Sequence, residues 1–493
     1  MRTAAVALLL STVFAAILTP LIRMWALNSN FLDHALTSRK IHGRPIPRLG
    51  GIAIVVGFFA PLVGLLLLRS DVGAMFLAER DLVFGLFIGG PLIALLGIYD
   101  DIKGADAKKK FAVQFLVAGL MYAFHFRMDS IANPFGNAIA LGWLSLPVTL
   151  LWFVGIINAM NLIDGLDGLA GGVALIAVAT TFGLSVQNGH PLMILFCAAL
   201  AGSIVGFLFY NFNPASIFMG DTGSMFLGFI LAASALRTHQ KSTTAVAVLI
   251  PIIALGLPIL DTLLAMSRRA VRGQPIFQAD REHIHHRLLA AGLSHRQAVF
   301  VLYGICVLFG AGAQILTVVN NGLQTGATVL GLAAVSFFFL RRLGYLQFEP
   351  NQKLSEKRRK NRLLRAEVRR LSRSLQVIIS LDEVWNIVSE AGKVFGASCA
   401  RMELEVLDSK ELRVRRWGGV VTERKLRVKQ FNLIGPKGGK GFVEFAWDPA
   451  TTTEDRDQEI LIELFCDYVS ESCDAVRLKD RSPVRLGRDL TVL

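Results

Sequence analysis

The chain has 493 residues, 53% of them hydrophobic, and a mean hydropathy of +0.52. This composition excludes an ordinary soluble protein, because the apolar residues gather in runs of about 20, the length that crosses a bilayer. The net charge of +14 comes half from the apolar part and half from residues 341–493, which hold 30 of the 51 basic and 23 of the 37 acidic residues. The sequence therefore indicates a membrane enzyme or transporter with a charged tail.

The first apolar run resembles a secretory signal but is longer, and no clear small-residue cleavage site follows it. We expect it to be the first of about eleven transmembrane helices in an all-α polytopic membrane domain, residues 1–342. The expected spans are 4–24, 49–68, 82–99, 111–128, 139–157, 168–187, 191–210, 224–236, 243–266, 298–319 and 323–340. The five cysteines have no CxxC spacing, so neither a disulfide framework nor a zinc site is predicted.

The polar connections between these spans alternate between two membrane faces. One face carries 15 lysines and arginines, and the other carries 6 if Arg2 is included. Because excess Lys and Arg marks the cytoplasmic face, we expect the N-terminus outside and the C-terminus inside.

Beyond the last span the sequence predicts a basic linker helix over 343–379 and a small cytoplasmic α/β domain over 380–493. The basic helix could lie on anionic headgroups or be a solvated linker. The domain should contain a helix, four alternating strands and a closing helix. This order resembles a GAF domain, which implies small-molecule binding or dimerisation. Plain docking to a partner or regulator is equally open.

Four polar motifs interrupt the face expected to be cytoplasmic. They read GIYDDIKG (97–104), NAMNLIDGLDGLAGG (158–172), NFNPASIFMGDTGSMFLG (211–228) and REHIHHRL (281–288). Each alone has a plain explanation. Asp100 and Asp101 could be interfacial residues. Asp164 and Asp167 could cap the helix that follows them. We expect the Asn and Asp residues from Asn158 onward to lie at the start of that helix.

Together, however, five carboxylates and a His/Arg cluster fall on one membrane face. Carboxylates gathered without a covering charge would repel one another and raise their pKa values. A divalent cation removes that cost, and hard oxygen ligands suit Mg²⁺ or Mn²⁺. Basic side chains beside a metal suggest a phosphate or pyrophosphate substrate. No Gly-rich Walker loop is present, so nucleotide binding of that kind is not predicted.

These motifs, in this order from about Asp33 to Leu289, resemble the polyprenyl-phosphate N-acetylhexosamine-1-phosphate transferases, which include the phospho-MurNAc-pentapeptide translocase. The matching segments are SRKIHGRPIPRLGG, DDIKGADAKKKF, NAMNLIDGLDGLAGG, FMGDTGS and HIHHRL. HIHHRL is similar to the N-acetylglucosamine branch. The resemblance implies transfer of a sugar 1-phosphate, most simply GlcNAc-1-phosphate, from a UDP-sugar to a polyprenyl (undecaprenyl) phosphate, with release of UMP.

The resemblance also implies site residues, with Mg²⁺ as cofactor. Asp100, Asp101, Asp164 and Asp221 are the expected catalytic residues, with Asp100 as the base, if one is needed, and Asp221 and Asn161 at the metal. The expected substrate-binding residues are Lys108, Lys110, Asn158, Asn161, Asp167, Phe218, His283, His285, His286 and Arg287. Lys40, His42 and Arg48 fall in the first matching segment.

Two alternative functions stay open: a phospho-MurNAc-pentapeptide transferase, and an ion-coupled secondary transporter with Asp164, Asp167 and Asp261 as coupling sites. The coupling sites of a transporter should lie near the bilayer midplane, whereas these polar clusters are expected at the ends of spans. The expected partners of the transferase are a UDP-HexNAc, polyprenyl phosphate and membrane lipids, with no nucleic acid, and a homodimer stays open. The resemblance places it in a bacterial cytoplasmic (inner) membrane, at the first lipid-linked step of envelope polysaccharide synthesis.

Overall fold

The computed structural model forms two compact units, which we describe separately. The first comprises Met1–Asp33, Pro45–Arg269 and Ile276–Phe348, and the second comprises His34–Arg44, Ala270–Pro275 and Glu349–Leu493. The structure describes residues 1–29, 32–33, 46–68, 70–131, 139–240, 249–272, 283–319, 322–345, 351–375, 380–405, 412–417, 427–434, 440–448 and 456–479.

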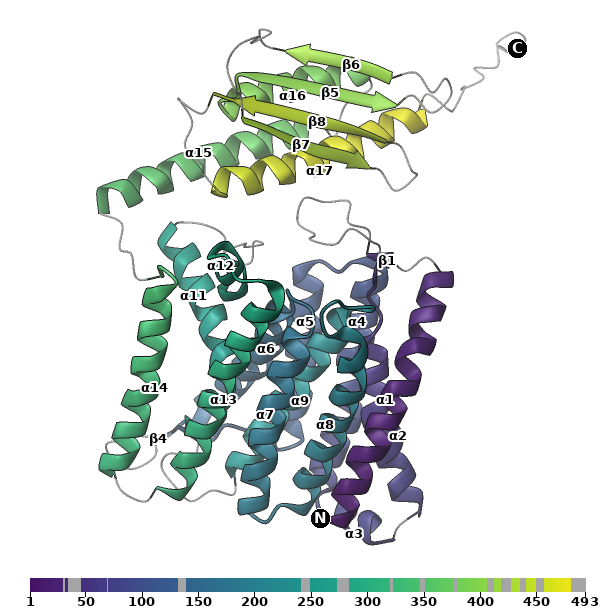
Figure 1. Cartoon of the computed structure of the whole chain (residues 1–493), viewed down its shortest axis with the longest axis vertical. Helices are drawn as coiled ribbons and strands as arrows, with labels where there is room; N and C mark the ends of the chain where they lie inside the picture. The colour runs from purple at the N-terminus through teal and green to yellow at the C-terminus, as the bar shows by residue number, and fades with distance from the viewer. Residues whose placement is uncertain are drawn as a thin grey trace, which may run out of the picture. The chain divides into compact units, whose positions relative to one another are not determined.

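The first unit is a bundle of long helices (Figure 1). Its helices are α1 (Arg2–Asn28), α2 (Gly51–Leu68), α3 (Ser70–Ala78), α4 (Arg80–Lys103), α5 (Ala107–Ala123), α6 (Ser145–Ile163), α7 (Leu169–Gln187), α8 (Pro191–Asn211), α9 (Gly220–Gln240), α10 (Leu249–Ala254), α11 (Gly256–Arg272), α12 (Ile284–Ala290), α13 (His295–Val318), α14 (Gly322–Arg342) and the 3₁₀ turn η1 (Gly142–Leu144). Two short antiparallel pairs join β1 (Leu32–Asp33) to β2 (Ile46–Pro47) and β3 (Ser130–Ile131) to β4 (Ile139–Ala140).

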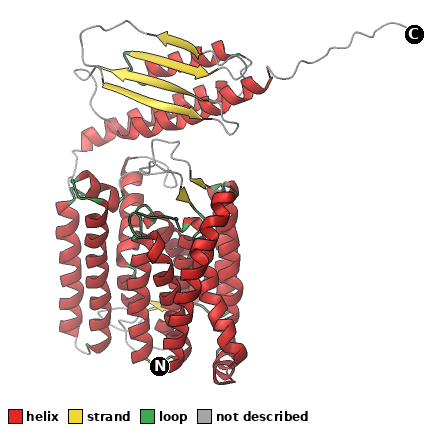
Figure 2. Ribbon diagram, turned by 45° about the vertical axis from the view of Figure 1, so that its right-hand side comes forward, coloured by secondary structure: helices red, strands yellow, loops and turns green. Residues whose placement is uncertain are grey.

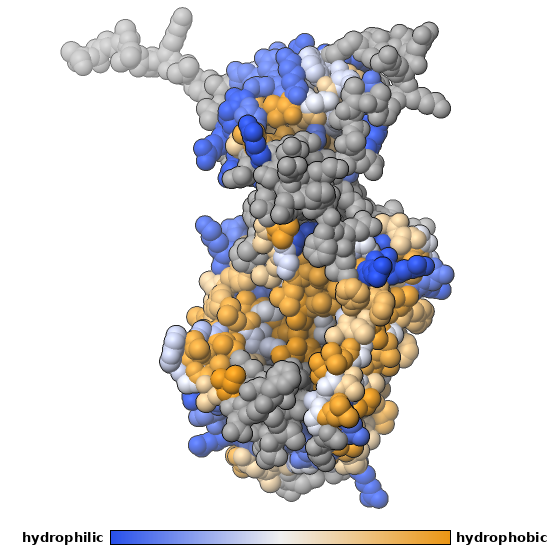
Figure 3. Space-filling model, turned by 90° about the vertical axis from the view of Figure 1, so that its left-hand side faces the viewer, coloured by the Kyte–Doolittle hydropathy of each residue, from blue (hydrophilic) through white to orange (hydrophobic). Residues whose placement is uncertain are grey.

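Every expected span overlaps one of these helices within the described residues. Seven of them are long and apolar enough to cross a membrane, or up to eight if the bent pair α2–α3 is one span. Large apolar side chains also face outward, such as Leu67 at 79% and Phe209 at 71% exposure. Apolar side chains cover much of the visible surface of this unit, and hydrophilic ones gather toward its ends (Figure 3). The protein is therefore a multi-pass membrane protein, while the count of eleven stays a prediction.

One expected boundary is wrong in a way that affects the site. The sequence suggests a span over 139–157 and a polar connection from Asn158, but α6 begins at Ser145 and continues to Ile163. Asn158 and Asn161 therefore lie in the last turns of α6, not at the start of the following helix. The helix can continue because neighbouring helices supply hydrogen-bond partners for both amides.

The second unit contains an antiparallel sheet (yellow in Figure 2), and its strand order is β6-β5-β8-β7, as labelled in Figure 1. Its elements are α15 (Asn351–Leu375), α16 (Leu381–Val394), β5 (Cys399–Glu405), β6 (Leu412–Trp417), β7 (Arg427–Ile434), β8 (Lys440–Trp447) and α17 (Arg456–Lys479). Alternate residues of the strands, such as Met402 and Phe445, are buried against the helices. The predicted helix, four strands and closing helix are confirmed. The resemblance to a GAF domain stays a prediction.

The basic helix α15 belongs to this second unit, whereas the sequence suggests a separate linker. Leu364, Leu371 and Leu375 on α15 are buried in the same core as Phe465 of α17. Its apolar face is therefore occupied by the domain itself.

Candidate active site

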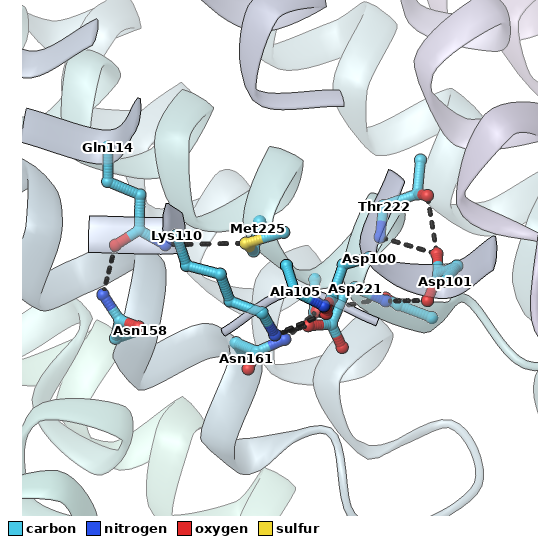
Figure 4. A network of polar contacts seen from close by, with 12 residues as sticks. Asp100, Asp101, Ala105, Lys110, Gln114, Asn158, Asn161, Asp221, Thr222 and Met225 are labelled. Atoms are coloured by element: carbon cyan, nitrogen blue, oxygen red, sulfur yellow. Dashed lines mark hydrogen bonds and ion pairs between the residues drawn. The ribbon is translucent and has the colours of Figure 1, made fainter. Parts of the chain in front are cut away.

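The first turn of α9 is held by Asp101, which lies in the last turn of α4. Its Oδ1 accepts a hydrogen bond from the Asp221 backbone N–H (2.8 Å), and its Oδ2 accepts from the Thr222 N–H (3.0 Å) and hydroxyl (2.6 Å) (Figure 4). A carboxylate here satisfies N–H groups that have no partner within their own helix. Both oxygens of Asp101 thus fix the position of Asp221.

Glycine makes this contact between α4 and α9 possible. A Cβ at Gly97, one turn before Asp101, would lie 2.3 Å from the Thr222 Cα. Gly220 has a φ of +66°, and a Cβ there would lie 2.5 Å from the Asp101 carboxylate. The two helices therefore approach backbone to backbone, as the GDTG turn requires.

Asp100 and Asp221 share the ammonium group of Lys110, which lies in the first turn of α5. Lys110 Nζ pairs with Asp100 Oδ2 and lies 2.6 Å from Asp221 Oδ2. Asp100 Oδ1 accepts from the Ala105 N–H at 2.6 Å. Three helix ends thus converge on two carboxylates and one ammonium group (Figure 4).

Two asparagines connect α6 to this cluster. Asn161 Nδ2 donates to Ser224 Oγ (2.9 Å), and the Asn161 side chain also hydrogen-bonds to Asp221. Asn158 Nδ2 donates to Gln114 Oε1 at 2.7 Å. Asn161 therefore lies at the cluster, while Asn158 joins α6 to α5 one turn away.

The turn between α6 and α7 contains both remaining carboxylates, in different environments. Asp167 is buried, and its Oδ2 accepts from Asn213 Nδ2 (2.9 Å) and the Ala215 N–H (3.1 Å). The residue at the start of α7 is Gly168, with a φ of +76°. The alternative that Asp167 caps α7 is therefore wrong, because its carboxylate binds the 213–215 loop instead.

Asp164 is half-buried and faces the carboxylate cluster. Burial, together with the negative charges of Asp221 and Asp101, raises the pKa of Asp164 to about 8, and Arg48 opposes this increase. An ionised Asp164 is thus stabilised by any additional positive charge at this position. This environment fits a cation with hard oxygen ligands.

The segment around Phe218 is paired with the segment that follows β2. The Phe218 N–H donates to the Pro47 carbonyl (2.8 Å), and the Gly50 N–H donates to the Phe218 carbonyl (2.9 Å). Arg48 therefore lies beside the GDTG turn. Lys40 and His42 fall outside the described residues.

The histidine motif forms the short helix α12. His283 Nδ1 lies 2.9 Å from Asp261 Oδ2 on α11, and the rings of His285 and His286 are 4.3 Å apart. His285 is buried against the α6–α7 turn, since a Cβ at Gly165 would lie 2.3 Å from its Nε2. Two motifs more than 100 residues apart are thereby in direct contact.

Two basic residues expected to bind substrate, Arg287 and Lys108, lie in different environments. The Arg287 guanidinium donates to the Leu343 carbonyl at 3.0 Å and lies 4.0 Å from the centre of the Tyr345 ring. The first unit accordingly extends past Arg342. Lys108 is exposed on the first turn of α5.

Several residues that support the cluster or its neighbouring turn were not predicted as site residues from the sequence, namely Gln114, Thr222, Ser224 and Tyr303. Gln114 follows Lys110 by four residues, and Ser224 follows Asp221 by three, so each shares a helix face with a site residue. This spacing is the signal that could have identified them. Tyr303, which donates to the Gly168 carbonyl at 2.6 Å, carries no such signal.

The fold and the cluster together define a multi-pass membrane protein with a charged site where its helices end. Comparison with known proteins agrees with this class. Glycosyl transferase family 4 matches residues 83–239, a range that includes every carboxylate of the cluster.

Similar proteins match longer stretches of the chain. The probable undecaprenyl-phosphate N-acetylglucosaminyl 1-phosphate transferase of Bacillus subtilis is 41% identical over 312 residues, covering 63% of this chain and 84% of that relative. The decaprenyl-phosphate N-acetylglucosaminephosphotransferase of Mycobacterium leprae is 35% identical over 328 residues (60% and 80%). A phospho-N-acetylmuramoyl-pentapeptide-transferase of Listeria welshimeri is 35% identical over 246 residues (48% and 74%). The chain belongs to glycosyl transferase family 4.

Proposed function

We propose that this protein transfers N-acetylglucosamine 1-phosphate from UDP-GlcNAc to a membrane polyprenyl phosphate and releases UMP. The observation that carries the proposal is the cluster of Asp100, Lys110 and Asp221 at three converging helix ends. The Bacillus and Mycobacterium relatives are named for this transfer. A charged site at the ends of membrane-spanning helices suits a reaction between a water-soluble nucleotide sugar and a lipid phosphate.

The reaction forms one phosphorus–oxygen bond and breaks another. A phosphate oxygen of the lipid attacks the β-phosphorus of the donor, and the bond from that phosphorus to the oxygen bridging the α-phosphorus breaks, so that UMP leaves with the bonding electrons. A phosphate monoester is largely ionised at pH 7 and needs little base catalysis. Asp100 therefore serves mainly to hold Lys110 and to orient the lipid phosphate, and Lys110 stabilises negative charge.

Mg²⁺ is the proposed cofactor, with Mn²⁺ as a substitute. Among the described residues no three His, Cys, Asp or Glu side chains form a closed metal site. Mg²⁺ is commonly held by one or two carboxylates together with substrate phosphates, so Asp221 with the Asn161 carbonyl oxygen fits this mode. When bound, the ion would neutralise the pyrophosphate.

The remaining residues would bind the donor. Asp164 and the histidine helix adjoin one another through Gly165, so one ligand could contact both. Phe218 would stack near the uracil, and Lys108 would attract phosphate. Asp167 holds the 213–215 loop and contributes indirectly.

We also propose a cytoplasmic-membrane location with the site facing the cytoplasm. The positive-inside pattern of the connections supports it. Helix α12 lies at the end of the bundle opposite the N-terminus (Figure 1), which agrees with an odd number of crossings before the histidine motif.

The test uses the purified full-length chain, a polyprenyl phosphate, Mg²⁺ and UDP-[¹⁴C]GlcNAc. We expect a chloroform-soluble labelled lipid and an equal amount of UMP. UDP-MurNAc-pentapeptide in the same assay tests the alternative donor, and preferential use of it would replace the proposal. Absence of transfer with every UDP-HexNAc would reject it, and would leave ion-coupled transport to be examined.

A further inference from the structure

Asp261 on α11 is a buried carboxylate with both oxygens engaged by the start of α12. It is 3% exposed. Its Oδ1 accepts from the Ile284 N–H at 2.9 Å, and its Oδ2 lies 2.9 Å from His283 Nδ1. Asp261 therefore fixes both the backbone and the first side chain of the histidine motif.

Helix α12 has only seven residues, Ile284–Ala290. A helix of this length is not stable by itself, because the cost of nucleation exceeds the gain from its few internal hydrogen bonds. Its position must come from contacts with neighbouring elements. The buried bonds to Asp261 are two such contacts, and the packing of Ile284 and Leu288 in the core of the first unit adds a third.

The next histidine connects α12 to the α6–α7 turn. His285 is 2% exposed, and neither ring nitrogen has a hydrogen-bond partner among the described residues. Its ring is stacked parallel to that of His283, with centres 5.8 Å apart, and its Nε2 lies against Gly165. Burial, together with the charge of His286, lowers the pKa of His285 to about 3, so its imidazole is neutral at pH 7.

A neutral imidazole has one donor and one acceptor nitrogen, and a buried polar group without partners is costly. The Nε2 nitrogen lies next to Gly165, which follows Asp164 in the chain. A polar ligand in contact with this turn could satisfy Nε2. Whether His285 can reach such a ligand depends on the position of α12, and hence on Asp261.

We propose that Asp261 is a positioning residue for binding of the nucleotide-sugar donor. It holds His283 and the start of α12, and thereby places His285 against the Asp164–Asp167 turn. Asp261 does not itself contact substrate. The inference rests on the proposed transferase function, and it gives a defined role to a carboxylate that a transporter would use for ion coupling.

The kinetic test compares Asp261→Ala and Asp261→Asn in the full-length chain. Loss of the anchor in Asp261→Ala should raise the KM for UDP-GlcNAc about tenfold or more, with the KM for polyprenyl phosphate within about twofold. Asp261→Asn retains an oxygen for the Ile284 N–H and an amide that can donate to His283 Nδ1, so its KM should stay within about threefold of wild type. Thr262→Val is the matched control, because the Thr262 hydroxyl donates to the Pro258 carbonyl of its own helix and bonds to no other element among the described residues.

Hydrogen–deuterium exchange tests the positioning without relying on transfer activity. In Asp261→Ala, exchange should increase in peptides covering 284–290 and 164–172, and remain unchanged in 295–318. Unchanged exchange in the first two segments would overturn the proposal. An equal rise in KM for both substrates, or a fall in kcat alone, would also overturn it. If wild type shows no transfer, the proposed function fails, and exchange alone decides whether Asp261 positions α12.

Discussion

The two units of the molecule differ in how deeply their ion pairs are buried, and among the described residues the most buried pairs lie in the membrane unit. In the membrane unit, Lys110 is shared by Asp100 and Asp221 with side chains at most 28% exposed, and the Asp261–His283 pair is almost fully buried. In the second unit, the side chains of the pairs Arg370–Glu390 and Arg415–Asp382 are 48–73% exposed.

Exposed ion pairs contribute little to stability, whereas buried charges are costly unless they are fully paired. The buried ion pairs of the membrane unit are therefore not expected to increase the stability of the fold. The difference supports our proposal that the chemistry occurs in the membrane unit, and we expect substitutions in the two units to have very different effects.

The largest effect is expected from Asp221→Asn. Removing the carboxylate that would hold both the metal and Lys110 should lower kcat by about 10³-fold. The measurement is the initial rate of labelled-lipid formation at saturating substrates. Asp129→Asn is the control, since the exposed Asp129 carboxylate accepts from the Ser145 hydroxyl, outside the cluster, and this variant should retain the wild-type rate. Near-normal transfer in Asp221→Asn would remove this residue from the site.

Lys110→Gln should have the next largest effect. Without the ammonium group Asp100 and Asp221 repel each other, so kcat/KM should fall about 10²-fold. The adjacent exposed Lys109, changed to Gln, provides the control. Equal losses in both variants would indicate a general effect of positive charge on this helix rather than a specific ion pair.

Asp101→Asn should cause a smaller loss of kcat than the two preceding variants, because Asp101 acts through its hydrogen bonds to α9. An amide oxygen can accept from the Asp221 or Thr222 N–H, but the amide nitrogen cannot, so kcat should fall about tenfold and Tm should also decrease. Asp106→Asn is the matched control, because Asp106 precedes α5 without a side-chain capping bond. A 10³-fold loss with unchanged Tm would assign Asp101 a direct chemical role.

Asp164→Asn tests the electrostatics of the site through stability. In the unfolded chain Asp164 ionises near pH 4, whereas in the folded protein its pKa is about 8, so folding becomes less favourable as pH rises between these values. In chelator, Asp164→Asn should therefore have a higher Tm than wild type at pH 8, and the difference should shrink toward pH 5. A difference independent of pH would contradict the raised pKa.

The smallest effect is expected from truncation after Phe348. This cut removes Glu349–Leu493, the main part of the second unit, but retains Leu343 and Tyr345, which contact Arg287. Because all the cluster residues lie in the first unit, kcat should stay within about threefold of the full chain. A cut after Arg342 should lower kcat further, because it also removes Leu343 and Tyr345. Loss of activity after the cut at Phe348 would show that the second unit takes part in catalysis.

The sequence predicted those features that depend on local pattern. Apolar runs predicted where the helices lie, and alternation predicted the four strands of the second unit. Asp100, Asp164 and Asp221 stood out because carboxylates are rare beside such runs. Contacts between distant segments could not be predicted in this way.

Three examples show the limit. The α6 helix continues past Asn158 because Gln114 of α5 accepts its hydrogen bond. Asp167 binds the 213–215 loop rather than α7. Asp261 appeared as a candidate only for transport, since its pairing with His283 depends on how α11 and α12 pack.

We propose that the cluster transfers a phosphosugar rather than a sugar, and [β-³²P]UDP-GlcNAc distinguishes the two directly. With polyprenyl phosphate and Mg²⁺, we expect the ³²P to enter the chloroform-soluble lipid while unlabelled UMP is released. Recovery of the ³²P in UDP, with the sugar alone on the lipid, would contradict it.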